Sequence, residues 1–181
     1  MWTPWEEAGL EHLRLVRSGS SVVANGLVIG LQAGRPFRIG YEIRCDGRWR
    51  VREVRAAALD SERPVLELLA DGEGHWKRGG GESVPELDGC IDVDISATPF
   101  TNTLPIRRLG LQPGKSTDVD VAYIRVPELL VGPERQRYGS LEARTDSGHY
   151  RFEALPSGFT AELPVDADGL VIDYPGLFRR V

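Results

Sequence analysis

Several residue types that mark particular classes of protein are scarce in this chain of 181 residues. It has two cysteines, Cys45 and Cys90, too few for the disulfide framework of a small secreted protein. Each lies in an alternating stretch, so we expect two small buried thiols. The three histidines, His12, His75 and His149, are scattered and lack the spacing of metal ligands. We therefore expect no metal and no other cofactor.

Long hydrophobic runs and an excess of positive charge are also missing. The longest apolar run, residues 26–31, is far shorter than the ~20 residues that a membrane-spanning helix needs. The N-terminal residues carry acids where a secretory signal carries bases, so we expect a cytoplasmic protein. The net charge of -5 argues against nucleic-acid binding by whole-surface attraction. Apart from Lys77 and Lys115 every cationic side chain is arginine, whose planar group suits carboxylates and phosphates.

The chain does contain the turn residues that are typical of a β-sheet protein. Its 21 glycines and 12 prolines are spread throughout, and turn signals recur about every ten residues, as in sandwiches and barrels. The clearest hairpin turns at Asp46 and Gly47, with alternating apolar residues on both arms. We expect further turns at Asp71, 146–148 and 166–169, where aspartate and glycine or serine again interrupt alternating stretches.

Helical periodicity is weak along the whole chain. Residues 5–17 are the best helix candidate, although Gly9 interrupts them, and residues 126–139 have room for one helical turn between prolines. Asn25 and Gly26 are interpreted as a turn between two short strands. The sequence thus predicts one all-β domain over residues 1–181, mostly antiparallel, with at most one or two short helical turns.

Paired aspartates stand out within two of the predicted strands. Asp92 and Asp94 alternate with apolar residues, and residues 118–120 repeat the pattern. Two carboxylates about 7 Å apart repel one another unless cations or hydrogen bonds accompany them, and Arg107 and Arg108 are the natural partners. Three interpretations stay open: surface ion pairs, the polar lining of a ligand cleft, or a catalytic or metal-binding carboxylate pair.

Residues 98–109, TPFTNTLPIRRL, join these two strands. Prolines follow Thr98 and Leu104, and since the residue before a proline disfavours helix, we expect no helix here. Thr101 and Asn102 can hydrogen-bond to their own backbone, which favours a rigid turn. One interpretation is that this loop presents its amide, hydroxyls and two arginines to a polar headgroup. The other is that it is only a well-braced corner.

A glycine-rich stretch, residues 72–82, has the spacing of neither phosphate-binding loop pattern, and we expect a mobile loop that presents Trp76. Two tyrosines in the later strands complete the candidate contacts. The candidate ligand-binding residues are therefore Trp76, Asp92, Asp94, Thr98, Thr101, Asn102, Arg107, Arg108, Tyr123 and Tyr138. The sequence predicts no catalytic residue, because it has no nucleophile elbow and no clustered histidine.

Residues 87–109, LDGCIDVDISATPFTNTLPIRRL, resemble the signature of the bacterial putative glycolipid-binding family, long classed as a domain of unknown function. GEGHW, YIRVPEL, QRYGSL and VDADGLVIDYPGLF match the family as well, so the resemblance spans essentially the whole chain. The resemblance implies a fold similar to that of bacterial lipoprotein and lipid carrier proteins. In that fold a single large antiparallel sheet curls into an incomplete barrel or roll. No catalytic residues come with the resemblance.

Three functions are compatible with these patterns. The first is a lipid- or glycolipid-binding protein, with acyl chains on the apolar sheet face and the headgroup at the polar loop. The second is an enzyme that acts on a glycosylated or phosphorylated small molecule through Asp92 and Asp94. The third is a structural or interaction domain without a small ligand. We expect binding rather than catalysis, and the sequence leaves ligand identity and oligomeric state open.

Overall fold

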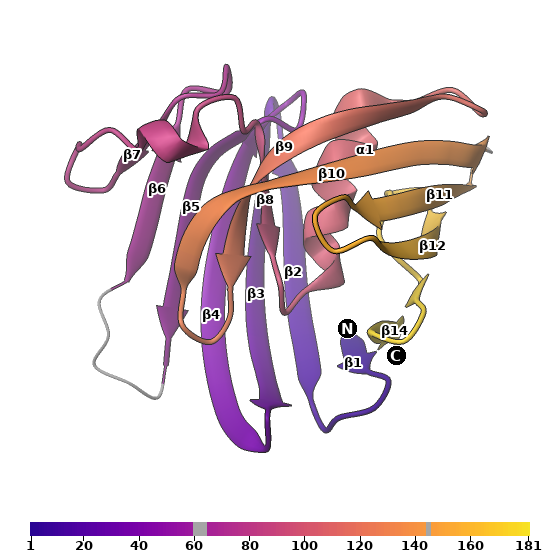
Figure 1. Ribbon diagram of the computed structural model, residues 1–181, viewed down its shortest axis with the longest axis horizontal. Coiled ribbons are helices and arrows are strands. Elements are labelled where there is room, and N and C mark those ends of the chain that lie inside the picture. Colours follow the sequence, from indigo (N-terminus) through magenta and orange to yellow (C-terminus); the bar gives the residue numbers. More distant parts are fainter. Residues whose placement is uncertain (60–64, 144–145) are drawn as a thin grey trace.

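The structure, a computed structural model, describes residues 1–59, 65–143 and 146–181. Strands dominate it and divide between two sheets (Figure 1). The larger sheet has the order β13-β14-β1-β2-β3-β4-β5-β6-β7, with antiparallel neighbours throughout. Its strands are β1 (Trp2–Pro4), β2 (Leu10–Ser18), β3 (Ser21–Gln32), β4 (Arg35–Asp46), β5 (Val51–Ala58), β6 (Leu66–Ala70), β7 (Trp76–Arg78), β13 (Asp173–Tyr174) and β14 (Phe178–Arg180).

The smaller sheet has the order β12-β11-β10-β9-β8. Its first four strands pair antiparallel, whereas β8 and β9 run parallel. A parallel pair needs a crossover connection, and the helical residues between β8 and β9 provide it. The elements of this part are η1 (Pro85–Leu87), β8 (Asp92–Ile95), η2 (Pro99–Asn102), α1 (Thr103–Leu109), β9 (Ser116–Arg125), β10 (Leu130–Ala143), β11 (Ser147–Ala154) and β12 (Phe159–Asp166).

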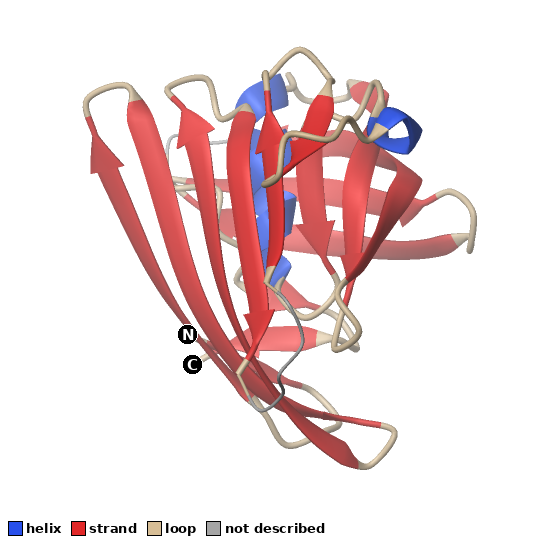
Figure 2. Cartoon of the chain, turned by 90° about the vertical axis from the view of Figure 1, so that its left-hand side faces the viewer, coloured by secondary structure: helices blue, strands red, loops and turns tan. Residues whose placement is uncertain are grey.

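The predicted all-β fold is confirmed: a large antiparallel sheet is combined with a curled half-barrel, and helix is confined to short segments. Figure 2 shows α1 between the long strands of the larger sheet and the smaller sheet. The hydroxyl of Thr103, at the start of α1, donates to the carbonyl oxygen of Gly169 in the β12–β13 connection at 2.9 Å. The helix therefore ties the C-terminal segment to the junction of the two sheets.

Both helix candidates are strands, so those two predictions are wrong. Residues 5–17 contain most of β2, which pairs with β3 along its whole length. Residues 126–139 contain a turn and the first part of β10. In β2 the alternation decided the outcome, because Glu11, Leu13 and Leu15 face the interior while the residues between them are exposed. Neighbouring strands supply the hydrogen bonds that outweigh a modest helix propensity.

Asn25 and Gly26 do not form a turn; they lie in the middle of β3, which corrects that prediction. Gly26 pairs with Tyr41 of β4, and the tyrosine ring lies across the glycine. A Cβ atom on Gly26 would fall 2.1 Å from two atoms of that ring. The glycine therefore marks a close approach of a side chain to the backbone, and it allows Tyr41 to reach Glu11 on β2.

Residues 98–109 form a 3-10 turn followed by α1, so the expectation of no helix there is wrong. Thr98 is extended, as a residue before proline should be, and its hydroxyl accepts a hydrogen bond from the Phe100 N–H at 3.0 Å. Pro105 lies in the first turn of α1, where backbone N–H groups have no helical partner, so a proline removes no helical hydrogen bond. Gly110 then ends the helix at a φ of 54°.

Three of the predicted aspartate turns are confirmed, and they share one arrangement. Asp46, Asp71 and Asp166 each accept, through Oδ1, the backbone N–H groups of the second and fourth residues that follow. A carboxylate that accepts two N–H groups replaces the bonds that the backbone lacks in a turn. The fourth turn was predicted at 146–148. Residues 144–145 are outside the described residues, and β11 begins at Ser147.

The core consists of two apolar clusters, the larger of which contains both cysteines, as expected. It also contains Trp76, which is only 1% exposed and donates from Nε1 to the Cys90 carbonyl oxygen at 2.7 Å. The expected mobile loop that presents Trp76 is therefore wrong, since β7 packs this side chain into the interior. Burial raises the pKa of Cys90 to about 12, which keeps its thiol protonated at neutral pH.

Candidate functional site

A cleft opens between the larger sheet and the C-terminal segment. Its outer part, called here the outer cleft, has a volume of about 340 Å³ and extends along β1 to β4 and β14. This volume lies within the range of about 300–1,000 Å³ that is common for small-molecule pockets. Most of the lining is apolar and includes Trp2, Leu10, Val28, Ile29, Phe37, Ala97, Leu177 and Phe178.

The inner cleft continues from the outer cleft toward the smaller sheet. It has a volume of about 370 Å³ and shares Ser96, Leu177 and Phe178 with the outer cleft. One wall is aromatic: the rings of Phe159 and Tyr174 lie 6.2 Å apart, and those of Tyr174 and Phe178 6.4 Å apart. The polar side chains in its lining include Asp94, Thr98, Asn102, Tyr123, Arg125 and Glu134.

Glu11 is the main polar group of the outer cleft, and it is only 2% exposed. Its Oε1 accepts the hydroxyl hydrogens of Tyr41 at 2.5 Å and Thr98 at 2.7 Å. Its Oε2 is buried and has no hydrogen-bond partner among the described residues. Such an oxygen destabilises the site until a donor reaches it, because an unpaired buried polar atom loses its hydration without compensation.

Burial also changes the protonation of this carboxyl group. Removal from water raises the pKa of Glu11 from 4.5 to about 7, although the hydrogen bonds from Tyr41 and Thr98 oppose the rise. Glu6 and Glu7 are exposed at the same cleft, and no lysine or arginine belongs to the described lining of the outer cleft. The outer cleft is therefore apolar, and its charged or chargeable groups are carboxyls.

Asp94 anchors a hydrogen-bonded network at the wall of the inner cleft. Its Oδ1 accepts the Thr101 hydroxyl and its Oδ2 accepts the Gln136 amide, both at 2.7 Å. The Tyr138 hydroxyl lies 3.3 Å from Gln136 Oε1 and donates to Asn102 Oδ1 at 3.1 Å. Burial raises the pKa of Asp94, while the Gln136 and Thr101 hydrogen bonds lower it. This network holds the polar corner rigid.

Asp92 lies on the same strand as Asp94 but has a different partner. Arg108 donates to it in a bidentate arrangement, with Nη2 at 2.6 Å from Oδ2 and Nε at 3.0 Å from Oδ1. Asp92 is fully buried and the Arg108 side chain is 15% exposed. Burial raises the pKa of Asp92, and the hydrogen bonds and charge of Arg108 oppose that rise. The pair encloses this carboxylate and leaves no open face for a substrate.

Arg107 and Arg108 border a separate hollow, called here the arginine hollow. It has a volume of about 460 Å³ and is lined by Gly47, Arg48, Trp49, Arg50, Arg107 and Arg108. It lies between the β4–β5 connection and the last turn of α1, whereas the inner cleft is lined by Asn102, which precedes the first turn of this helix.

Comparison with known proteins decides the family. The model of the family described as "Putative glycolipid-binding" matches residues 1–180. The chain belongs to this family. Among solved structures it is similar to a DUF1089 family protein from Pseudomonas aeruginosa, with 42% sequence identity and a TM-score of 0.85 over 96% of this chain and 92% of that one. No curated protein matches the chain.

The residues that resembled the family signature in sequence divide between two sites in this glycolipid-binding family fold. Asp94, Thr98, Asn102 and Tyr123 line the inner cleft, and Thr101 and Tyr138 lie behind them in the same hydrogen-bonded network. The remaining candidates lie elsewhere: Arg107 and Arg108 line the arginine hollow, Asp92 is buried in an ion pair with Arg108, and Trp76 lies in the core.

Sequence reasoning missed Glu11, the most unusual side chain of the cleft. The signal in the sequence was the alternation of side chains along a strand. Once residues 10–18 are assigned to a strand, Glu11 falls on the same face as Leu13 and Leu15. An acid on an apolar strand face is rare without a function or a partner. The helix assignment concealed this pattern.

Among the residues that the structure describes, no three His, Cys, Asp or Glu side chains lie together as a metal site would require. Within the same ranges, no helix has the length and apolar character needed to cross a membrane.

Proposed function

We propose that this protein binds an amphiphile whose alkyl chain lies in the outer cleft and whose headgroup is uncharged and rich in hydroxyls, as in a glycolipid. The description of the family supports the glycolipid class. The observation that carries the proposal is the unpartnered Oε2 of Glu11 within an apolar cleft.

The apolar lining supplies the driving force for the chain. Leu177 and Ile29 are 40% and 43% exposed, and Phe178 lies between the outer and inner clefts. Each methylene that an alkyl chain buries against such a surface contributes about 0.8 kcal/mol. A hydroxylated headgroup without a chain would lack this contribution.

The polar groups of the cleft favour a neutral donor over an anion. Glu11 and Asp94 are both carboxyls without a cationic partner within 4 Å among the described residues. Sugar hydroxyls donate hydrogen bonds to carboxyl oxygens, and Thr98 and Asn102 offer further polar atoms at the inner cleft. Glu6 and Glu7 at the outer cleft repel an anionic headgroup.

The same contacts count against the enzyme alternative. Asp92 is 0% exposed and held by Arg108, whereas Asp94 binds Thr101 and Gln136. A catalytic carboxylate pair must face one substrate, and these two face different partners. Lipid binding therefore accounts better for the cleft than catalysis through this pair.

Calorimetric titration with alkyl glucosides tests the proposal. We expect octyl, decyl and dodecyl glucoside to bind below their micelle concentrations, with affinity rising about fourfold for each added methylene. Glucose alone should not bind measurably, and dodecyl phosphate should bind more weakly than dodecyl glucoside. Equal affinities across the chain-length series would refute a chain-binding cleft.

A matched pair of variants locates the binding site. Leu177→Glu places a charge in the cleft and should reduce dodecyl glucoside affinity about tenfold or more, because the chain would lie against a carboxylate. Leu130→Glu is the control, since Leu130 is 61% exposed and lies outside the cleft lining. Equal losses in both variants would contradict the assignment to the cleft.

A further inference from the structure

The arginine hollow concentrates positive charge on a protein whose net charge is -5. Four of its six lining residues are arginines, and none is acidic. Arginine in the last turn of a helix is favourable in itself, which accounts for Arg107 and Arg108 only in part. It does not account for Arg48 and Arg50, which reach the hollow from the β4–β5 connection of the larger sheet.

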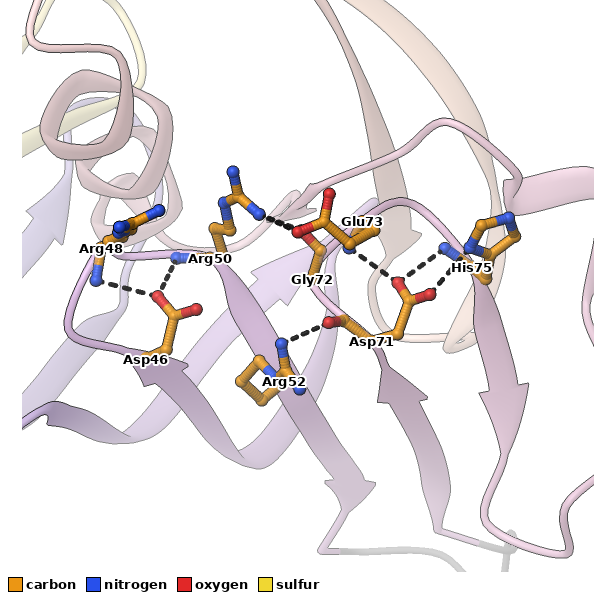
Figure 3. A network of polar contacts seen from close by, with 8 residues as sticks. All are labelled: Asp46, Arg48, Arg50, Arg52, Asp71, Gly72, Glu73 and His75. Atoms are coloured by element: carbon orange, nitrogen blue, oxygen red, sulfur yellow. Dashed lines mark hydrogen bonds and ion pairs between the residues drawn. The ribbon is translucent and has the colours of Figure 1, made fainter.

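The carboxylates around the hollow neutralise only some of these guanidinium groups. Asp92 binds Arg108. Figure 3 shows the second pair, in which Glu73 binds Arg50. Arg48 and Arg107 have no carboxylate within 4 Å among the described residues, and in Figure 3 no contact joins the Arg48 guanidinium to the other residues drawn.

Asp46 is the nearest further acid along the chain, and its Oδ1 accepts the backbone N–H groups of Arg48 and Arg50. Two guanidinium groups thus have no side-chain anion to balance them.

One of these two guanidinium groups, that of Arg107, is held in place by the fold. Arg107 donates from Nη1 to the Ala167 carbonyl oxygen at 3.2 Å, and its guanidinium carbon lies 5.5 Å from the centroid of the Trp49 ring. Arg17 lies over the same ring at 5.1 Å. Contacts of this kind fix a cation before a ligand arrives, which reduces the ordering that binding would otherwise require.

Trp49 itself holds an uncommon backbone conformation. Its φ is 64°, in the left-handed region that side chains other than Asn, Asp and Gly rarely adopt, and yet the residue is buried. The hydrogen bonds of the Asp46 turn hold it there. The turn therefore maintains a strained residue that places its ring beneath two arginine side chains.

We propose that the arginine hollow binds a phosphoryl group, with Arg48 and Arg107 as its principal ligands and Arg50 and Arg108 at its sides. The planar guanidinium group matches phosphate oxygens with paired N–H donors, and a phosphate carries a charge of about -1.5 to -2 at pH 7. That charge balances the two guanidinium groups that lack a carboxylate. This site is separate from the cleft and does not depend on the proposed lipid binding.

Titration with inorganic pyrophosphate, in a phosphate-free buffer of low ionic strength, tests the site. We expect saturable binding that weakens as salt increases. Arg48→Gln and Arg107→Gln should each reduce the affinity about tenfold, because each removes a charge-assisted hydrogen bond. Arg38→Gln is the matched control on an exposed arginine of β4 outside the hollow, and it should change the affinity by less than about twofold.

Binding to vesicles shows whether the phosphoryl group belongs to a lipid headgroup or to a soluble molecule. Cosedimentation with phosphatidylcholine vesicles that contain phosphatidic acid, lost in Arg107→Gln, would assign the site to a lipid headgroup. Binding of pyrophosphate without vesicle binding would assign it to a soluble phosphorylated ligand.

No saturable binding of either probe up to about 10 mM phosphate groups, or an equal loss in Arg38→Gln, would overturn the proposal. Arg48→Gln keeps the test decisive, since the exposed Arg48 side chain makes no hydrogen bond or ion pair with the other described residues that the substitution could break. Leu177→Glu should leave pyrophosphate binding unchanged, so a failure of the lipid proposal would not affect this result.

Discussion

The inner cleft and the arginine hollow lie near opposite ends of one short helix and differ in chemistry. Asn102, just before α1, lines the inner cleft, whereas Arg107 and Arg108 in its last turn line the hollow. The cleft combines apolar surface with Glu11 and Asp94, which have no cationic partner within 4 Å among the described residues, whereas four of the six residues that line the hollow are arginines. The net charge of -5 therefore describes neither site, because the fold places acidic side chains at the cleft and arginines at the hollow.

The largest expected effect concerns the wall of the arginine hollow. Asp92→Ala should lower the free energy of unfolding by about 3–5 kcal/mol, because it leaves the mostly buried Arg108 without its partner. Urea denaturation measures the loss. Asp92→Leu combined with Arg108→Met should recover most of the stability, as an apolar pair needs no compensating charge. A loss below about 1 kcal/mol for Asp92→Ala would mean that the pair does not hold this wall.

The outer cleft should make the stability of the protein depend on pH through Glu11. The pKa of Glu11 is raised from 4.5 to about 7, so between these values the folded protein keeps a proton that the unfolded chain has released. The free energy of unfolding should therefore fall by about 3 kcal/mol as the pH rises from about 4.5 to about 7. Denaturation at a series of pH values measures this slope.

Glu11→Gln is the control for that slope, since glutamine keeps the shape and does not titrate. The variant should lose the part of the pH dependence that falls between about 4.5 and 7. An unchanged slope in Glu11→Gln would assign the dependence to another group and remove Glu11 as the distinguishing feature of the cleft.

A smaller effect should follow at the contact that positions Glu11. Gly26→Ala puts a Cβ atom 2.1 Å from the Tyr41 ring, so the ring must move and its hydrogen bond to Glu11 must weaken. We expect a loss of about 1–3 kcal/mol in the free energy of unfolding. Gly132→Ala in β10 is the matched control, because its Cβ atom would meet no atom within 4 Å. Equal stability of the two variants would show that the glycine is not required for the tyrosine.

The smallest effect should occur at the free cation of the hollow. Arg48→Gln should change the free energy of unfolding by less than about 0.5 kcal/mol, since its exposed side chain makes no ion pair among the described residues. Thermal denaturation checks this. A larger loss would indicate a structural role for Arg48. The hollow would then no longer combine a pair that stabilises the fold, Asp92 and Arg108, with an arginine that is free to bind a ligand.

Much of the fold could be predicted from local patterns. The Asp46, Asp71 and Asp166 turns carry their own hydrogen-bond acceptors, so short sequence windows contain the information that closes them. Residues 98–109, with their two prolines, show the limit of such windows. Thr98 is extended as predicted, yet Pro105 is helical, because its place in the first turn of α1 depends on where the helix begins.

The candidate site was predicted only in part, for a reason that lies in strand pairing. Asp94, Thr98 and Asn102 could be selected because they crowd one loop and the strand before it. Glu11 was missed because residues 5–17 were assigned to a helix, and because its partners Tyr41 and Thr98 lie 30 and 87 positions away, outside any short window. Gly26 looked like a turn residue for the same reason, since its neighbour is a ring on another strand.

The sequence by itself determined the all-β class, the aspartate turns and the family, since alternation, turn chemistry and a long signature are all local along the chain. Only the tertiary structure decided that one polar stretch serves two regions, with Asn102 at the cleft and Arg107 at the hollow. The physical reason is that Asn102 precedes α1 and Arg107 lies in its last turn, so the helix carries the two side chains to its opposite ends, where other elements supply different neighbours.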